Sequence, residues 1–290
     1  MKNINFIFLG TDDFSIYVLD KLMESDYIPN LIITAPDRKA GRGQKIQKSP
    51  VKIWAESNNI KVLSPEKIDE LFIGQIKNLG EWDLSIVASY GKILPLDFLN
   101  IPKFQTINVH PSLLPKYRGA SPIESAILED DKETGVSIML MDAKMDHGPI
   151  FKQEVIGFEE WNSKTEIEKT LAQKGAESLV EIIPKWVDRS IEPKEQNHEI
   201  ATFTKKVVKE DGLISFIDLQ DEKKAREIYL KIIAYKPWPS VYFDINHLGE
   251  SLRVKITGAV WENGNLKITK VIPADRKEMD YESFKMGFIK

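Results

Sequence analysis

Three side chains on two separated segments of this sequence could together carry out an acyl transfer. Asn108 and His110 lie two residues apart, where an apolar run ends in a proline-bounded loop, and Asp146 follows a second apolar run. Residues i and i+2 of a strand share one face, so the amide and the imidazole point the same way. An amide donates to a developing oxyanion, an imidazole moves a proton, and a carboxylate fixes the imidazole's tautomer. These residues are the candidate catalytic set.

The same residues also have a purely structural interpretation. His110 would then cap a strand, Asn108 would pair with the main chain, and Asp146 would be a turn residue ahead of Gly148. The chain has four scattered histidines without His-x-x-x-His spacing and no cysteine. A cysteine nucleophile is therefore excluded, and we expect no metal site.

The segments around the candidate residues favour the catalytic interpretation. Residues 107–119 read INVHPSLLPKYRG, and residues 139–149 read MLMDAKMDHGP. Asn-x-His-Pro-Ser-Leu-Leu-Pro followed by Arg-Gly and, after an apolar strand, by Asp-x-Gly-Pro resembles the formyltransferase family that uses 10-formyltetrahydrofolate. The resemblance implies that 10-formyltetrahydrofolate is the formyl donor and that the catalytic residues are Asn108, His110 and Asp146.

A further apolar strand, at 83–88, supplies the candidate folate site. It ends in Ser-Tyr-Gly-Lys-Ile-Leu-Pro, and ligands of open α/β sheets lie beyond the carboxyl ends of strands. The Ala-x-Tyr-Gly-x-x-Leu-Pro pattern is similar to the family's wall against the folate pterin, and the loop after His110 would bound the same ligand. The resemblance implies folate contacts by Val87, Tyr90, Gly91, Ile93, Leu94 and Pro95, and by Ser112, Leu113, Leu114 and Pro115.

The elements that must position these residues alternate between strand and helix. An apolar strand at 4–9 is followed by an amphipathic helix and a second strand at 31–34, an order that implies a parallel sheet. The first turn reads GTDDFS and lacks Gly-x-Gly-x-x-Gly, which disfavours a nicotinamide dinucleotide. We expect an α/β fold with a Rossmann-like, mostly parallel sheet. The strands at 83–88, 106–109 and 134–141 would bring the candidate residues to one edge.

The sequence changes character near residue 188, after a long amphipathic helix that begins at Ser163. A polar stretch containing Pro193 follows and is typical of a linker. We expect a formyltransferase catalytic domain at 1–188, a linker at 189–206 and a C-terminal domain at 207–290. Strands expected at 212–216, 240–245, 252–260 and 266–272, with one helix at 222–235, favour a small β-rich, OB-like domain. This domain is shortened after Val260 relative to the family.

Residues 36–48 carry five basic residues and one acid within an otherwise acidic half of the chain. An isolated charge run is usually a solvated loop. Alternatively, Lys and Arg neutralise phosphates, and glycines let a flexible arm order on binding. The order Pro-Asp-Arg-x-x-Gly-Arg-Gly resembles the tRNA-contacting loop of family members that act on methionyl-tRNA. The resemblance implies tRNA contacts by Arg38, Lys39, Arg42, Lys45 and Lys48.

The charge and hydropathy of the chain limit its partners and location. The net charge is −4; residues 201–290 hold 16 Lys and Arg against 13 Asp and Glu, or +3, which leaves −7 for residues 1–200. This asymmetry permits a polyanionic partner at the C-terminal part. No apolar run is long enough to span a bilayer, and the first one is too short for a signal peptide. We expect a cytoplasmic protein without membrane partners, and a monomer.

The resemblance implies transfer of a formyl group from 10-formyltetrahydrofolate to the α-amino group of methionyl-tRNA, the initiator. Two alternatives stay open: a sugar-nucleotide N-formyltransferase, and a catalytically inert nucleic-acid-binding relative. The basic arm and the KPWP segment at 236–239 argue against the first alternative, and the intact catalytic set argues against the second. Two residues depart from the family's motifs. Asp12 stands where the first turn usually has proline, and His147 follows Asp146 where a small polar residue is usual.

Overall fold

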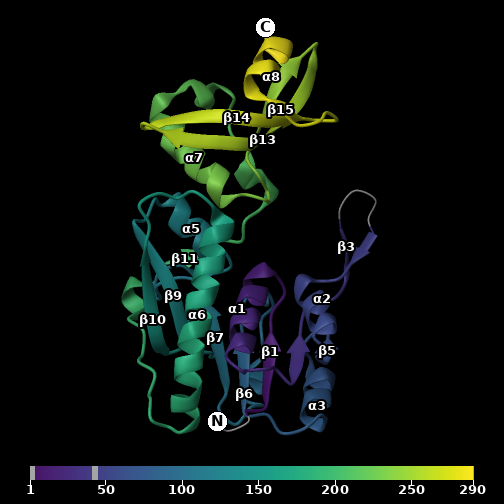
Figure 1. Cartoon of the computed structure of the whole chain (residues 1–290), viewed down its shortest axis with the longest axis vertical. Helices are drawn as coiled ribbons and strands as arrows, with labels where there is room; N and C mark the ends of the chain where they lie inside the picture. Colours follow the sequence, from purple (N-terminus) through teal and green to yellow (C-terminus); the bar gives the residue numbers. More distant parts are fainter. Residues whose placement is uncertain (1–3, 41–44, 290) are drawn as a thin grey trace. The chain divides into compact units, whose positions relative to one another are not determined.

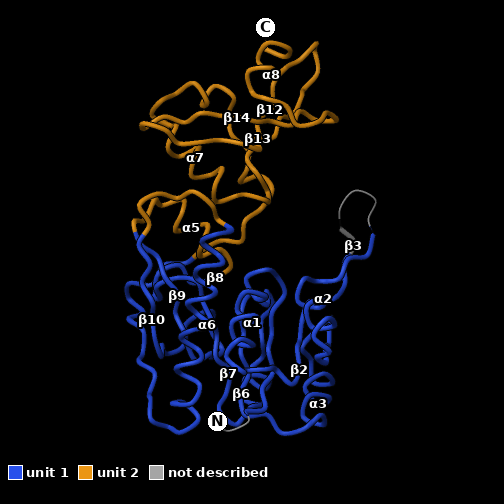
Figure 2. The backbone as a smooth tube through the Cα atoms, viewed as in Figure 1, with its two compact units in different colours: residues 1–119, 133–157, 165–203 blue, residues 120–132, 158–164, 204–290 orange. Residues whose placement is uncertain are grey.

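The structure is a computed structural model that describes residues 4–40 and 45–289 (Figure 1). The chain forms two compact units (Figure 2). Unit 1 comprises Met1–Gly119, Glu133–Gly157 and Thr165–Phe203, and unit 2 comprises Ala120–Lys132, Phe158–Lys164 and Thr204–Lys290. Both units are therefore assembled from segments that are not contiguous in the sequence. The domain boundaries at 188 and 206 stay predictions.

Unit 1 is built on a seven-stranded sheet with the order β10-β9-β7-β6-β1-β2-β5. The five strands from β7 to β5 are parallel, whereas β9 runs antiparallel to β7 and β10 antiparallel to β9. The expected mostly parallel α/β sheet is confirmed. The strands are β1 Phe6–Leu9, β2 Leu31–Ile33, β5 Val62–Leu63, β6 Leu84–Val87, β7 Thr106–His110, β9 Glu133–Leu140 and β10 Ile150–Gly157.

The central strands β1, β2 and β6 are continuous runs that are buried throughout, as expected for parallel strands covered on both faces. Helix α6 packs closely on the sheet because it carries Gly175. A Cβ atom there would lie 2.5 Å from Cγ1 of Val109 on β7. The helices that begin within unit 1 are α1 Asp13–Glu24, α2 Pro50–Ser57, α3 Glu70–Asn78 and α4 Leu96–Leu99; α6 spans Lys164–Val187.

The strand order reverses between β1 and β6, because β2 and β5 follow on one side of β1 and β7 follows β6 on the other. Ligands of such sheets bind beyond the carboxyl ends of the strands at this switch point. Asn108 on β7 lies beside Val87 on β6, so the candidate catalytic strand borders this position. At the end of β1, the Asp12 carboxylate caps α1 and accepts from the main-chain N–H of Ser15 at 3.3 Å. A carboxylate therefore lies where a dinucleotide phosphate would bind.

Unit 2 contains a four-stranded antiparallel sheet with the order β12-β13-β14-β15. This small β-rich sheet agrees with the expected C-terminal domain, but the strand expected at 212–216 is wrong. Only Leu213 makes a bridge, to Tyr242, because a 3₁₀ turn begins at Ile217 before a ladder can extend. The elements are α5 Pro122–Leu128, α7 Ala225–Ala234, β12 Tyr242–His247, β13 Glu250–Glu262, β14 Asn265–Pro273, β15 Met279–Asp280 and α8 Tyr281–Phe288.

Arg226 on α7 ties the separate segments of unit 2 together. Its guanidinium donates to Asp130 at 2.6 Å and to Glu160 at 2.6 Å, and charge-assisted pairs of this kind are the strong ones. The Tyr229 hydroxyl on the same helix donates to the main-chain oxygen of Trp161 at 3.0 Å. These contacts explain why residues 120–132 and 158–164 belong to this unit. Among the described residues, no helix is both long and apolar enough to cross a membrane.

Candidate active site

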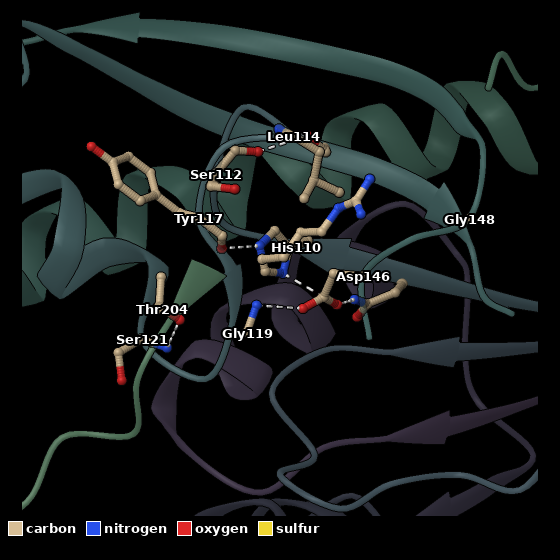
Figure 3. Close-up of polar contacts among 12 residues, drawn as sticks. His110, Ser112, Leu114, Tyr117, Gly119, Ser121, Asp146, Gly148 and Thr204 are labelled. Atoms are coloured by element: carbon tan, nitrogen blue, oxygen red, sulfur yellow. Dashed lines mark hydrogen bonds and ion pairs between the residues drawn. The ribbon is translucent and has the colours of Figure 1, made fainter. Parts of the chain in front are cut away.

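The three candidate catalytic side chains meet at the carboxyl end of β7. Figure 3 shows His110 and Asp146 facing each other there. Asn108 and His110 are 8% and 4% exposed, and Asp146 comes from the loop between β9 and β10. Asp146 Oδ1 lies 3.4 Å from Nδ2 of Asn108 and 3.6 Å from Nδ1 of His110. The carboxylate therefore faces the amide and the imidazole at once, and one strand holds both of them in register.

A main-chain carbonyl group determines which tautomer the neutral His110 ring adopts. Its Nε2 lies 3.0 Å from the carbonyl oxygen of Tyr117 (Figure 3). A carbonyl oxygen only accepts, so Nε2 must carry the proton. In the neutral ring Nδ1 is then the free basic nitrogen, and it faces Asp146. The Tyr117 carbonyl, rather than the carboxylate, sets the tautomer, while the carboxylate lies where it would stabilise a proton arriving at Nδ1.

The Asp146 loop is tightly constrained. Its Oδ2 accepts from the main-chain N–H of Gly119 at 2.8 Å (Figure 3). The residue itself has φ +47°, a left-handed conformation that few non-glycine residues adopt. Two residues later Gly148 passes so close to the main chain that a Cβ atom would lie 2.0 Å from the carbonyl oxygen of Leu140. The glycine of the Asp-x-Gly-Pro motif is thus a steric requirement.

Two buried polar residues that the sequence did not identify complete this region. Gln196 and Arg118 are 6% and 3% exposed, and Gln196 Nε2 donates to the carbonyl oxygens of Asp146 and Gly148. The Arg-Gly pair was part of the recognised motif but carried no assigned role. Gln196 lies in the stretch expected as a linker, and no local pattern links it to residue 146.

The loop from Ser112 to Pro115 is anchored by Ser137 on β9. The Ser137 hydroxyl donates to the carbonyl oxygen of Ser112 at 2.6 Å and accepts from the N–H of Leu114 at 3.0 Å. Gln153 on β10 donates to the same hydroxyl and to the carbonyl oxygen of Leu114. Ser112 and Leu114 are buried, whereas Leu113 and Pro115 are partly exposed. This part of the candidate folate site is therefore held rigidly by side chains of the antiparallel strands.

The candidate folate residues at and after the end of β6 differ in how deeply their side chains are buried. Val87, Tyr90 and Leu94 are buried in one apolar cluster, whereas the Ile93 side chain is 84% exposed. Burial raises the pKa of Tyr90 to about 12, and its hydroxyl has no hydrogen-bond partner among the described residues. Gly91 has φ +74°, which suits glycine. Pro95 is the N-cap residue of the short helix α4.

The described ends of the basic arm form a two-stranded antiparallel pair of β3 Arg38–Ala40 and β4 Lys45–Gln47. Its glycines, Gly41 and Gly43, lie outside the described residues, so the flexible arm stays a prediction. Arg38 and Lys45 are exposed. Lys48 is partly neutralised by Glu56 at 2.6 Å, a hydrogen bond that raises its pKa. Lys39 is part of β3, and Arg42 lies outside the described residues. At the base of the arm, Lys52 pairs with Asp37 at 2.8 Å.

His147, which departs from the family's motif, contacts residues outside the candidate catalytic set. Its Nδ1 lies 2.7 Å from Oδ2 of Asp142, and its ring stacks on His198 with centroids 4.0 Å apart. Within 4–40 and 45–289, no cluster of three or more His, Cys, Asp or Glu residues could hold a metal ion.

A buried amide, a basic imidazole nitrogen and a carboxylate at a strand end suit acyl transfer to an amine. Comparison with known proteins agrees with this geometry, because residues 1–183 match the family described as formyl transferase. The chain belongs to the formyl transferase family.

Similar sequences show to which group within the family the chain belongs. The chain is 40% identical over 274 residues to a methionyl-tRNA formyltransferase of Sulfurihydrogenibium sp., covering 94% of this chain and 86% of the relative. It is 35% identical over 303 residues to a methionyl-tRNA formyltransferase of Bacillus licheniformis, covering 97% and 94%. Within the family, this chain belongs with the methionyl-tRNA formyltransferases.

Solved structures share the fold at low sequence identity. A methionyl-tRNA formyltransferase from Clostridium thermocellum superposes with a TM-score of 0.60 at 17% identity, over 96% of this chain and 99% of that one. HypX from Aquifex aeolicus, in complex with tetrahydrofolic acid, gives 0.66 at 14% identity, over 100% of this chain and 48% of that one. These likenesses concern the fold alone.

Proposed function

We propose that this protein transfers the formyl group of 10-formyltetrahydrofolate to the α-amino group of methionyl-tRNA. The observation that carries the proposal is the Asp146 carboxylate facing Asn108 and His110 at the carboxyl end of β7. The full-length similarity to methionyl-tRNA formyltransferases supports the choice of substrate. The initiator tRNA, a monomeric state and a cytoplasmic location belong to the same proposal.

In the proposed reaction the neutral amine attacks the formyl carbon. A free α-amine has a pKa near 7.7–8.0, and esterification of the neighbouring carboxyl lowers it, so the nucleophile is available at neutral pH. The new C–N bond forms as the carbonyl π electrons move to oxygen, and Asn108 donates a hydrogen bond to that oxyanion. The intermediate then collapses, the bond to N10 breaks, and N10 leaves with a proton as tetrahydrofolate.

His110 and Asp146 would manage the proton that the amine loses. Nδ1 of His110 accepts it, directly or through a water, and the imidazolium then lies beside the Asp146 carboxylate. As the bond between the formyl carbon and N10 breaks, the same proton passes from His110 to N10, and the imidazole is neutral again. The Tyr117 carbonyl keeps the opposite nitrogen protonated throughout. No covalent intermediate on the protein is needed, which suits a chain without cysteine.

The remaining candidate residues would bind the two substrates. Val87, Tyr90, Gly91, Ile93, Leu94 and Pro95 would border the pterin of the folate on one side. Ser112, Leu113, Leu114 and Pro115 would do so on the other. The exposed charges of Arg38 and Lys45, with Lys39, Arg42 and Lys48, would contact tRNA phosphates, and the exposure of the first two supports this role.

Acid-gel electrophoresis of methionyl-tRNA, incubated with purified protein and 10-formyltetrahydrofolate, tests the proposal. We expect a formylated band that depends on both protein and donor. The matched reaction contains amino-sugar nucleotides in place of methionyl-tRNA. Formylation of the sugar alone would instead support a sugar-nucleotide N-formyltransferase, and tRNA binding without turnover would support an inert relative.

A further inference from the structure

The turn that carries the Asp146 carboxylate accepts hydrogen bonds from a residue that is distant in the sequence. Gln196 lies fifty residues after Asp146 in the sequence, yet its side-chain amide donates to the carbonyl oxygen of Asp146 at 3.0 Å and to that of Gly148 at 2.7 Å. Both hydrogens of the amide are thus used on one turn. Because Asp146 has a left-handed backbone conformation, the turn needs such outside support to persist.

The orientation of the Gln196 amide is unambiguous. Its Oε1 accepts from Nη2 of Arg118 at 2.6 Å and from Nε at 3.2 Å. A flipped amide would place its oxygen against two carbonyl oxygens and its NH2 group against a guanidinium. The buried guanidinium therefore dictates which way the two N–H donors point.

His198 extends the same network. Its Nδ1 lies 2.8 Å from Nη2 of Arg118, which can only donate, so Nδ1 must be unprotonated. The pKa of His198 is lowered, first because part of its hydration is removed and then because His147 and Arg118 lie beside it. A neutral ring at neutral pH is what this hydrogen bond requires.

We propose that Gln196 is a positioning residue for the formyl transfer. By holding both carbonyl groups of the 146–148 turn, it fixes the direction in which the Asp146 carboxylate leaves the main chain. The carboxylate then reaches His110 and Asn108 without reorganisation during the reaction. This inference rests on the proposed function, because it needs the wild-type chain to formylate methionyl-tRNA.

The substitution Gln196→Glu tests the proposal. It keeps the size and the Arg118 pair but replaces two donors by an oxygen that repels the carbonyl groups. We expect kcat to fall about tenfold to a hundredfold, with the KM for each substrate changed by less than about threefold. Gln196→Asn, one methylene shorter, should also lower kcat, since it cannot span both partners. Thr106→Val, which removes a buried hydrogen bond to Leu99 at the other end of β7, is the control for destabilisation alone.

A double-mutant cycle separates positioning from general damage. If Gln196 acts through Asp146, Gln196→Glu should have almost no further effect on kcat in an Asp146→Ala background. An undiminished kcat loss in that background would overturn the proposal, as would wild-type kcat in both single variants when their unfolding midpoints show a folded protein. Failure of the wild-type chain to formylate methionyl-tRNA would instead refute the proposed function.

Discussion

Two regions of unit 1 differ in how their polar and charged side chains are held: the carboxyl end of β7 with the catalytic set, which we call the catalytic edge, and the described ends of the basic arm. Asn108 and His110 are almost completely buried, and each side chain faces a specific polar partner, Asp146 and the Tyr117 carbonyl oxygen. In the arm, Arg38 and Lys45 are exposed, β3 pairs with β4, and Lys48 is bound by a simple ion pair. Catalysis that depends on fractions of an ångström requires buried side chains with fixed partners. Binding of a polyanion by charge requires only exposed basic side chains.

The largest expected effect concerns the catalytic edge. Asn108→Ala removes the donor that would face the oxyanion, so kcat should fall about 10²–10³-fold, with little change in the KM for the folate. Steady-state kinetics at saturating methionyl-tRNA measures this loss, and Asn78→Ala, on the exposed end of α3, is the control. A raised KM with unchanged kcat would mean that Asn108 binds substrate rather than the transition state.

An intermediate effect concerns the buried cluster beside that edge. Burial raises the pKa of Tyr90 to about 12 in the folded protein, whereas the pKa of an unfolded tyrosine is about 10. The unfolded state therefore loses protons first, and stability falls as the pH rises from about 10 to 12. Tyr90→Phe should remove this loss, worth up to about 2–3 kcal/mol, and should be neutral or stabilising at pH 7 because it deletes an unpaired hydroxyl.

Urea unfolding of both proteins at pH 7 and pH 11 checks this prediction. Tyr229→Phe is the matched control, because that hydroxyl donates to Trp161 and its removal should cost about 1 kcal/mol at pH 7. Equal losses for the two variants at pH 7 would mean that the Tyr90 hydroxyl has a partner.

The smallest effect concerns the arm. Arg42→Ala should raise the KM for methionyl-tRNA several-fold, leave kcat nearly unchanged, and reduce the slope of log affinity against log salt by about 1, as expected for one phosphate contact. Lys174→Ala, which removes one exposed charge from α6, is the matched control. If both variants have the same tRNA kinetics as the wild type, the arm is only a loop.

The sequence predicted the parallel sheet and the strands that carry the site, because buried β-runs and turn residues are local signals. It placed Asn108 and His110 on one face from their spacing alone. It could not predict the contact of Gln196 with the 146–148 turn, or the Tyr117 carbonyl that sets the His110 tautomer, because both depend on where the main chain folds. The strand expected at 212–216 failed for a similar reason: its apolar residues fit a strand, but among the described residues the stretch makes only an isolated bridge to Tyr242.

Each unit is built from segments that are not contiguous in the sequence, and this limits where the chain can be truncated. Residues 120–132 and 158–164 lie far upstream of α7, yet Arg226 of that helix is bound to Asp130 and Glu160. A fragment starting near residue 204 would leave this cation unneutralised and lose the acceptor of the Tyr229 hydroxyl. The upstream piece alone would in turn leave the Asp130 and Glu160 carboxylates without this guanidinium. Gene fusions, split reporters and truncated expression clones should therefore keep the polypeptide whole.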